Sequence, residues 1–325
     1  MKSALNVALK ISMFAALAAT MVTASQAQLA LTIAGTTAGF GISTVVTGLP
    51  SSGPYGPFGV TVNPAGKILT FDYGAQSFYQ FNDVDGQSFP VDVLTTHIPQ
   101  HDVRGVTTGG GKNFSANNGN GRLEVVNNDG SFVSTLVSGL NNPLGIVMDP
   151  TDGNIWLANC GTGQILKYDS TSGAVMKTFN TGCADGISIS GDGSTVYGAI
   201  GGFVKGFNTS TGFNVFNVAI SAVDGTAVGT GTIAGFIFAN TNDGKLYQID
   251  LNTSASTLIA SGGSRGDFVA VDPNGTLLLT QTDRIQRLTA PQGGGFGQTP
   301  EPGTLAMIAG MGTFGGLFIR RRLKK

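Results

Sequence analysis

The chain has few charged residues and almost none of the side chains from which metal centres and disulfide scaffolds are built. Only 11% of its 325 residues are charged, and it contains two cysteines, two histidines and one tryptophan. Two cysteines are too few for a disulfide-dense domain or a cysteine-rich zinc site. A disordered chain would combine low hydrophobicity with a strong excess of charge, whereas 41% of this sequence is hydrophobic. The chain therefore has the material for a folded core.

Glycine, in contrast, is abundant, with 50 residues beside 12 prolines. Because glycine costs about 1 kcal/mol at each position inside a helix, this composition argues against a helical protein. It predicts a turn-rich chain that is mostly β. The charge is unevenly placed, since residues 28–299 carry 11 basic and 18 acidic side chains. An acidic body speaks against a surface that binds nucleic acid.

The first 27 residues predict a secretory signal peptide. Lys2 and Lys10 form a positive n-region, residues 11–24 are an apolar run, and Ser25 and Ala27 are the small residues of a cleavage site. The alternative is a retained membrane anchor, but the run is short and ends in a cleavable tripeptide. Cleavage would leave a mature protein that begins near Gln28, outside the cytoplasm.

The C-terminal end carries three ordered parts. The tripeptide Pro300-Glu301-Pro302 is followed by the apolar, glycine-rich residues 303–319 and then by a basic cluster. A helix over residues 303–319 would span about 26 Å, just enough for a bilayer core, so we expect a transmembrane helix there. The basic cluster would stay on the cytoplasmic side, which leaves everything upstream outside.

This order of parts resembles the PEP-CTERM sorting signal, also known as the ice-binding-protein C-terminal domain. The matching residues are the apolar segment and Pro300, Glu301, Pro302, Arg320, Arg321 and Arg322. The resemblance implies an exosortase that recognises the tail, in a Gram-negative-type bacterium. It also implies export to the cell envelope, the outer surface or an exopolysaccharide matrix. It implies no chemistry for the body of the chain, because the tail occurs on many unrelated domains.

The body between these two signals repeats with a period of about 40 residues. Residues 57–64, PFGVTVNP, match residues 143–150, PLGIVMDP, and weaker copies occur elsewhere in the body. The aligned positions are Gly59, Gly105, Gly145, Gly186, Gly225 and Phe268. Each unit contains four short apolar strands separated by glycine or polar turns, which is typical of a β-propeller blade.

The two ends of the repeat predict how the ring closes. Residues 42–49 match residues 133–140, the fourth strand of the second unit, whereas the last unit ends after its third strand at Leu288. The early strand can therefore complete the last sheet and leave no exposed edge. The sequence predicts an all-β, six-bladed propeller over residues 28–290, followed by a flexible linker at 291–299. The unit resembles NHL-type propellers, including the SMP-30/gluconolactonase and virginiamycin B lyase-like groups.

The only cysteines, Cys160 and Cys183, flank the boundary between the third and fourth units. Cys160 follows a second strand and Cys183 leads into the next first strand, so both belong to turns on one face of the disc. Export makes oxidation favourable, and we predict a disulfide between the two blades. The alternative is a pair of separate buried thiols.

Polar side chains recur where second strands end and where the chain leads into first strands. Strand alternation places both sets of turns on the same face. The candidate metal or ligand residues are Asp72, Asn117, Asn159, Asp185, Asp224, Asn240 and Asp267. Such oxygen-bearing side chains around a channel could hold Ca²⁺. The alternative is that Asn and Asp cap tight turns, which explains why they recur in blade after blade.

The lactonase resemblance implies a metal held by a Glu from an early blade together with Asn and Asp. Glu124 is the only Glu in the body, and it lies in the middle of a strand, away from the matching position. The lyase resemblance implies a His with nearby Glu residues, but His97 and His101 lie in the link between the first two units. Their spacing with Asp102 suggests a metal clip, although without a further His or Cys we favour a solvated loop.

No serine-centred nucleophile motif or phosphate-binding loop is present in the sequence. Trp156, Tyr168, Phe71 and Phe81 are expected to pack between blades rather than to form an exposed sugar platform. The leading hypothesis is an exported, non-enzymatic propeller that binds a polysaccharide or a surface protein. A Ca²⁺-dependent lactonase or hydrolase and a structural matrix component are the alternatives. The expected partners also include the exosortase and, before processing, the membrane, but not nucleic acid.

Overall fold

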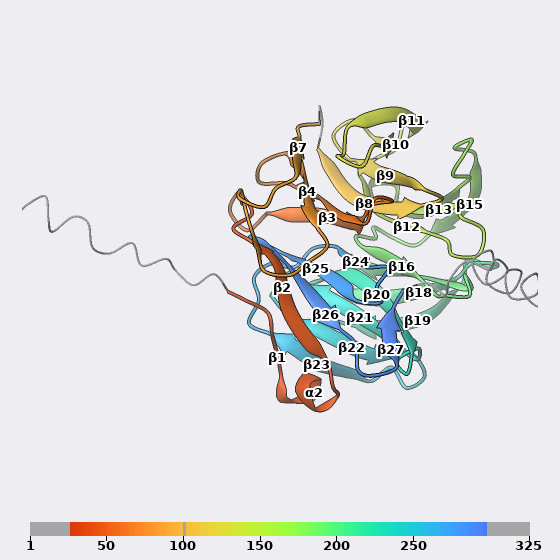
Figure 1. Ribbon diagram of the computed structural model, residues 1–325. Coiled ribbons are helices and arrows are strands. Elements are labelled where there is room, and N and C mark those ends of the chain that lie inside the picture. Colours follow the sequence, from red (N-terminus) through yellow and green to blue (C-terminus); the bar gives the residue numbers. More distant parts are fainter. Residues whose placement is uncertain (1–26, 100–101, 298–325) are drawn as a thin grey trace, which may run out of the picture.

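The computed structural model describes residues 27–99 and 102–297, so the predicted signal peptide, the sorting tail and His101 lie outside the described residues. The described chain forms six sheets, each built on four antiparallel strands (Figure 1). The innermost strand of each sheet contacts the innermost strand of the next, and the sixth contacts the first. The protein is an all-β, six-bladed propeller, as the repeat predicts.

Each blade runs outward from the channel. Blade one contains β3 (Pro57–Val62), β4 (Lys67–Asp72), β5 (Ser77–Asn82) and β7 (Thr95–His97). Blade two contains β8 (Val103–Gly109), β9 (Lys112–Asn117), β10 (Arg122–Val126) and β11 (Phe132–Ser138). Blade three contains β12 (Pro143–Met148), β13 (Ile155–Asn159), β14 (Gln164–Tyr168) and β15 (Val175–Asn180).

The second half of the ring follows the same order. Blade four contains β16 (Ile187–Ile189), β17 (Thr195–Ile200), β18 (Phe203–Asn208) and β19 (Asn214–Ala219). Blade five contains β20 (Val223–Gly231), β21 (Phe236–Thr241), β22 (Leu246–Asp250) and β23 (Ser256–Ser261). Blade six contains β24 (Val269–Val271), β25 (Leu277–Gln281), β26 (Arg284–Thr289) and, as its outer strand, β2 (Gly41–Thr47).

Strand β2 closes the ring as the outer strand of the last sheet, as the sequence predicts. It pairs antiparallel with β26, so that Ile42 lies opposite Leu288 and Thr47 opposite Arg284. A bulge between Thr44 and Val46 interrupts the ladder, and the side chain of Val46 is fully buried. The first and last parts of the propeller are thus held in one sheet, which removes an edge that would otherwise be open.

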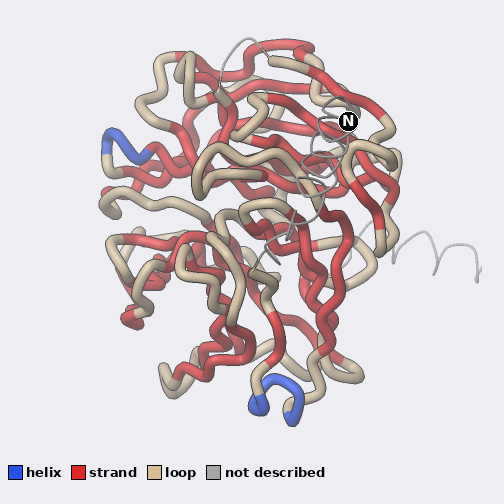
Figure 2. Tube along the Cα trace, turned by 90° about the vertical axis from the view of Figure 1, so that its left-hand side faces the viewer, coloured by secondary structure: helices blue, strands red, loops and turns tan. Residues whose placement is uncertain are grey.

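Three short strands outside the repeat were not predicted. They are β1 (Ala30–Leu31) on β23, β6 (Gln87–Ser88) parallel to β2, and β27 (Gly294–Phe296) on β20. Helix is confined, within the described residues, to α2 (Ile33–Thr37) and the 3₁₀ turn η1 (Cys160–Thr162), as Figure 2 shows. No helix in the described part of the chain is long and apolar enough to cross a membrane.

The structure differs from the expectation of a flexible linker at 291–299. Up to Gly297 this segment packs on blade five, where β27 pairs with the end of β20. The ring of Phe296 is buried, and its centroid lies 4.8 Å from that of Phe238. Backbone pairing and one buried aromatic ring outweigh the flexibility that the glycine-rich sequence suggests.

The repeated glycine is required because neighbouring innermost strands approach closely. A Cβ atom on Gly145 would lie 2.2 Å from the carbonyl oxygen of Asp185, to which the Gly145 N–H donates a hydrogen bond of 3.1 Å. The same arrangement joins Gly186 to the carbonyl of Asp224. In the sixth unit Phe268 takes the place of the glycine, and its ring reaches to within 3.2 Å of the Cβ position of Gly186. Phe268 therefore fills the narrow part of the channel.

Aromatic side chains pack between blades, as predicted. Trp156 is fully buried against Ala184 and Ile187 at the boundary of blades three and four. Tyr168 packs with residues of blade two, Phe71 with Val103 of blade two, and Phe81 with residues of blade six. The hydrophobic core is thus divided among the interfaces between neighbouring blades. The turns between strands surround the two ends of the channel.

Candidate functional site

The two ends of the channel carry different side chains. On one face the chain leads into the innermost strands, and the residue just before each aligned repeat position lies there. These residues are Phe58, Arg104, Leu144, Asp185, Asp224 and Asp267. We call this end the acidic face. At the opposite end the innermost strands turn into the second strands and β27 ends beside the channel, so we call it the tail face.

Three carboxyl groups and one guanidinium group fill the channel mouth on the acidic face. Asp224 and Asp267 are buried, and Arg265 lies between them. The Nη2 atom of Arg265 lies 2.6 Å from Oδ1 of Asp267 and 3.2 Å from Oδ2 of Asp224, and its Nε atom donates to Oδ2 of Asp267 at 3.1 Å. The resulting contact with Asp267 is bidentate, a geometry that orients arginine strongly.

Burial raises the pKa of each carboxyl group in this cluster above the pKa of an isolated aspartate. It raises the pKa of Asp267 to about 8, with the charge of Asp224 adding to the shift and Arg265 opposing it. Burial and the neighbouring Asp224 raise the pKa of Asp185 well above its usual value. The pKa of Asp224 is also raised by burial, against the opposing charge of Arg265. Burial thus raises the pKa of all three carboxyl groups, and the charge of Arg265 opposes the shift in each.

An aromatic cluster adjoins the acidic residues. The rings of Phe58 and Tyr73 stack with centroids 4.8 Å apart, and Tyr55 meets both edge-on. The guanidinium of Arg104 lies 4.8 Å from the Phe58 ring centroid and 4.7 Å from that of Tyr73. Arg265 lies 5.0 Å from the centroid of Tyr55. Tyr55 is 39% exposed, so this cluster offers an aromatic surface beside two cations at the channel mouth.

The structure brings together only some of the candidate residues. Asp185, Asp224 and Asp267 converge, whereas Asp72, Asn117 and Asn159 are the last residues of β4, β9 and β13 in three different blades. Oδ1 of Asp72 accepts the N–H of Ala75 at 2.8 Å, as in a capped turn. Burial raises the pKa of this Asp72 carboxyl to about 7.

The amide side chains behave in a similar way. Asn117 accepts the N–H of Asn120 at 3.3 Å, and Asn159 accepts the N–H of Asn141 at 2.8 Å. Asn240 donates instead to the carbonyl oxygens of Asp267 and Thr280, which ties blade five to blade six. Asp72 and Asn117 thus cap backbone three residues further on, as the turn-capping interpretation expects, whereas Asn159 and Asn240 bond to more distant backbone.

The donor set does not fit a Ca²⁺ ion. Within the described residues, no group of three or more His, Cys, Asp or Glu side chains could hold a metal. Arg265 donates to two of the three converging carboxylates, and a guanidinium there supplies the positive charge that a metal would bring. Several buried oxygens on this face lack a hydrogen-bond partner, among them Asp72 Oδ2, Asp224 Oδ1, Asn240 Oδ1 and Gln281 Oε1. Buried water commonly satisfies such atoms.

Of the remaining polar candidates, Glu124 and His97 lie between blades rather than at the channel. Glu124 is buried and accepts hydrogen bonds from Asn117 at 2.9 Å and Asn120 at 3.1 Å, both within blade two, and it lines a cavity between blades one and two. His97 lines the same interblade cavity of about 490 Å³. Asp102 pairs with Arg104 at 2.6 Å. The metal clip considered above includes His101, which lies outside the described residues.

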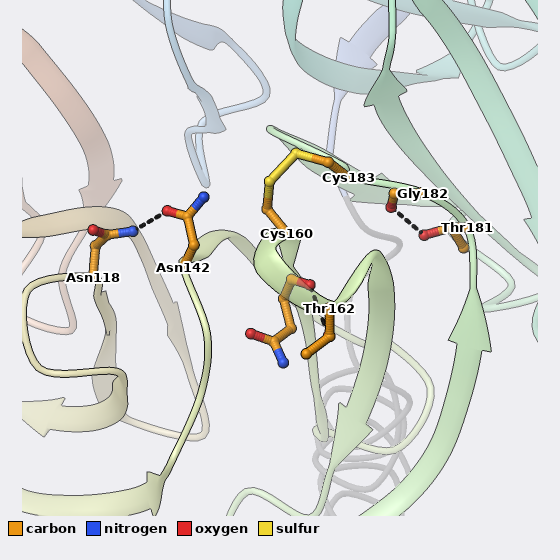
Figure 3. The surroundings of a disulfide bond; sticks show 8 residues. Asn118, Asn142, Cys160, Thr162, Thr181, Gly182 and Cys183 are labelled. Carbon is orange, nitrogen blue, oxygen red and sulfur yellow. Dashed lines mark hydrogen bonds between the residues drawn. A yellow bond between two sulfur atoms is a disulfide. The ribbon is translucent and has the colours of Figure 1, made fainter.

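Cys160 and Cys183 form the predicted disulfide, which ties blade three to the segment that leads into blade four (Figure 3). Their Cα atoms are 4.1 Å apart. The N–H of Thr181 donates to the carbonyl of Gly163 at 3.0 Å and reinforces the same junction. Asp185 follows two residues after Cys183, so the bond helps to position one carboxyl of the channel mouth.

Arg265, Arg104, Tyr55, Phe58 and Tyr73 were not singled out in the sequence. Phe58 and Arg104 were nevertheless detectable, because they occupy the position before the repeat glycine that Asp185, Asp224 and Asp267 occupy in other units. Arg265, Tyr55 and Tyr73 come from irregular turns without a counterpart in the repeat. No sequence signal marks them.

Comparison with known proteins identifies the tail and the fold. Residues 298–322 match the PEP-CTERM protein-sorting motif, so this is an exported propeller sorted to the envelope of a Gram-negative bacterium and recognised by an exosortase. No curated protein matches the chain. Similar solved structures include a streptogramin B lyase, with 13% identity and a TM-score of 0.53 over 77% of this chain and 97% of that one. The WD40 propeller domain of Doa1 matches with 16% identity and a TM-score of 0.56, over 75% and 79%. At these identities the likeness concerns the fold alone.

Proposed function

We propose that this exported propeller is a non-catalytic binding module for polysaccharide, displayed on the outer surface or in the extracellular matrix. The observation that carries the proposal is the exposed ring of Tyr55 beside Arg104 and Arg265 at the mouth of the channel. A sugar ring presents an apolar C–H face, which stacks on an aromatic ring. Its hydroxyl edge accepts from guanidinium groups and donates to carboxylates.

The closed channel favours binding over catalysis. A hydrolase needs an activated nucleophile or base within reach of a substrate. Here the carboxyl groups of Asp224 and Asp267 are buried and contact Arg265, while Phe268 fills the channel behind them. At the level of the repeat glycines only a void of about 20 Å³ remains. A ligand would therefore lie across the mouth, on Tyr55, rather than enter the disc.

The test is a glycan array followed by calorimetry with an oligosaccharide that binds. Replacement of Tyr55 removes the stacking surface, so we expect Tyr55→Ala to weaken binding about tenfold or more, the value of a good aromatic contact. Phe213→Ala is the matched control, because Phe213 is an exposed aromatic residue on the opposite face and should leave affinity unchanged. Equal losses in both variants, or no glycan binding by the parent protein, would contradict the proposal.

A metal-dependent lactonase is the rival, and the same samples separate the two. Calorimetry with Ca²⁺ and a lactone hydrolysis screen should show neither tight metal binding nor turnover. Metal-dependent turnover that disappears in Asp224→Asn would replace the binding module with the enzyme.

A further inference from the structure

Exposed apolar side chains collect on the tail face of the propeller. The described chain exposes 13 large hydrophobic side chains. Eight of them lie at the tail-face end of the blades, in or near the turns that join third strands to fourth strands. They are Ile33, Val84, Phe132, Val133, Val175, Met176, Phe213 and Val215. They come from the rims of five successive blades, since Val84 follows β5 and Ile33 belongs to α2 beside β23. Recurrence on blade after blade distinguishes this set from scattered surface residues.

The chain leaves the propeller at the centre of the same face. Strand β27 pairs with the last residues of β20, so that Phe296 lies opposite Gly229 and Gly294 opposite Gly231. The N–H of Phe296 donates to the carbonyl of Gly275, in the turn between β24 and β25, at 2.9 Å. Gly297 lines the channel cavity of about 290 Å³ that opens here. The last described residue is therefore fixed at the channel mouth of the tail face.

The sorting motif follows without a spacer, because its match begins at residue 298. Residues 298–302 separate Gly297 from the apolar segment that we expect to span the membrane. Fully extended, this stretch reaches about 20 Å. As long as the apolar segment is in the bilayer, the tail face must lie within that distance of the lipid headgroups.

We infer that the tail face is a membrane-contacting surface of the tailed protein, with its apolar rim residues in the lipid interface and the acidic face turned away. Apolar residues at an interface bury in the boundary between headgroups and acyl chains. Asp169 and Asp250 cap exposed turns on this face, so a zwitterionic surface suits it better than an anionic one. The inference goes beyond ligand binding, since it orients the whole molecule while the tail is uncut.

Blade four supplies a matched pair of probes. Phe213 precedes β19 on the tail face and is 73% exposed, whereas Phe203 begins β18 at the acidic end and is 37% exposed. The native Trp156 is fully buried and gives a constant background. The variants Phe213→Trp and Phe203→Trp therefore place a tryptophan at opposite ends of one blade, and so on opposite faces of the propeller.

The experiment is tryptophan fluorescence of the tailed protein in vesicles of phosphatidylcholine with brominated acyl chains. We expect the added emission of Phe213→Trp to fall roughly twofold relative to unbrominated vesicles, because its indole would sit about 5–10 Å deep, and that of Phe203→Trp to stay unchanged. Phe132→Trp, on blade two, is a second tail-face probe if the first variant fails to match the parent in near-ultraviolet circular dichroism. Equal quenching at both faces, stronger quenching of Phe203→Trp, or no quenching at any position would overturn the inference.

Discussion

Arg265 is the residue on which the acidic face depends. Within the described ranges 27–99 and 102–297, it is the only cation paired with the buried carboxyls of Asp224 and Asp267. Removal of one partner from a buried ionic cluster leaves the other charges without compensation. The carboxyl groups can then relieve the repulsion only by taking up protons, which links the effect of a substitution to pH.

We expect Arg265→Met to lower the free energy of unfolding by about 2 kcal/mol at pH 8 and by less at pH 5, which lies below the pKa of about 8 to which burial raises Asp267. Denaturant unfolding at the two pH values measures the difference. Lys245→Met is the matched control, because Lys245 pairs with Asp243 at 2.6 Å with both side chains exposed. Its loss should be small and the same at both pH values, because solvent screens an exposed ion pair. A loss for Arg265→Met that is the same at pH 5 and pH 8 would contradict the protonation model.

Asp72 provides a second test at the residue scale. Its folded pKa is raised from 3.8 to about 7 by burial, so the stability associated with the neutral carboxyl is complete below pH 4 and is lost as the pH rises through 7. Asp72→Asn stays neutral and keeps an oxygen for the Ala75 N–H. We therefore expect this variant to be more stable than the parent by about 1–3 kcal/mol at pH 8, with little difference at pH 4.

Asp250→Asn should behave in the opposite way. Hydrogen bonds from the N–H groups of Thr253 and Asn252 lower the pKa of Asp250, so its contribution is present above pH 4 and lost as the pH falls further. Thermal unfolding from pH 3 to pH 8 compares the two variants. Parallel pH profiles for Asp72→Asn and the parent would show that Asp72 is ionised in the folded protein.

At the scale of single elements, the disulfide fastens the segment that carries Asp185. Its two cysteines are 23 residues apart in the sequence, and closing a loop of that length stabilises a protein by about 3 kcal/mol. We expect the double variant Cys160→Ser/Cys183→Ser to lose about that much in urea unfolding. Reduced parent protein should lose the same amount, whereas an unchanged parent after reduction would mean that the bond is absent.

Some of the strands and site residues could be predicted from the sequence, and others could not. The blades and the closing strand β2 were predictable, because they repeat and their apolar alternation fixes which face is buried. Strand β27 was not, since its glycine-rich sequence has no alternation and its position depends on pairing with β20. Likewise Asp185, Asp224 and Asp267 were identifiable from the repeat. Arg265 comes from an irregular turn whose path only the folded chain defines.

At the scale of the whole molecule, we propose different roles for the two faces. Tyr55, Arg104 and Arg265 gather at one end of the channel, and the sorting tail leaves from the other. A polysaccharide in the matrix would thus meet the face that points outward. The small number of charges is compatible with this division, because the apolar side chains are placed between blades and on the tail face.

Hydrogen exchange of the protein with and without a binding oligosaccharide tests this division most directly. We expect slower amide exchange in residues 53–58 and 262–268, which form the acidic-face mouth, and no change in residues 210–216 on the tail face. Protection of residues 210–216, or of neither region under saturating ligand, would contradict the claim that the acidic face is the binding site.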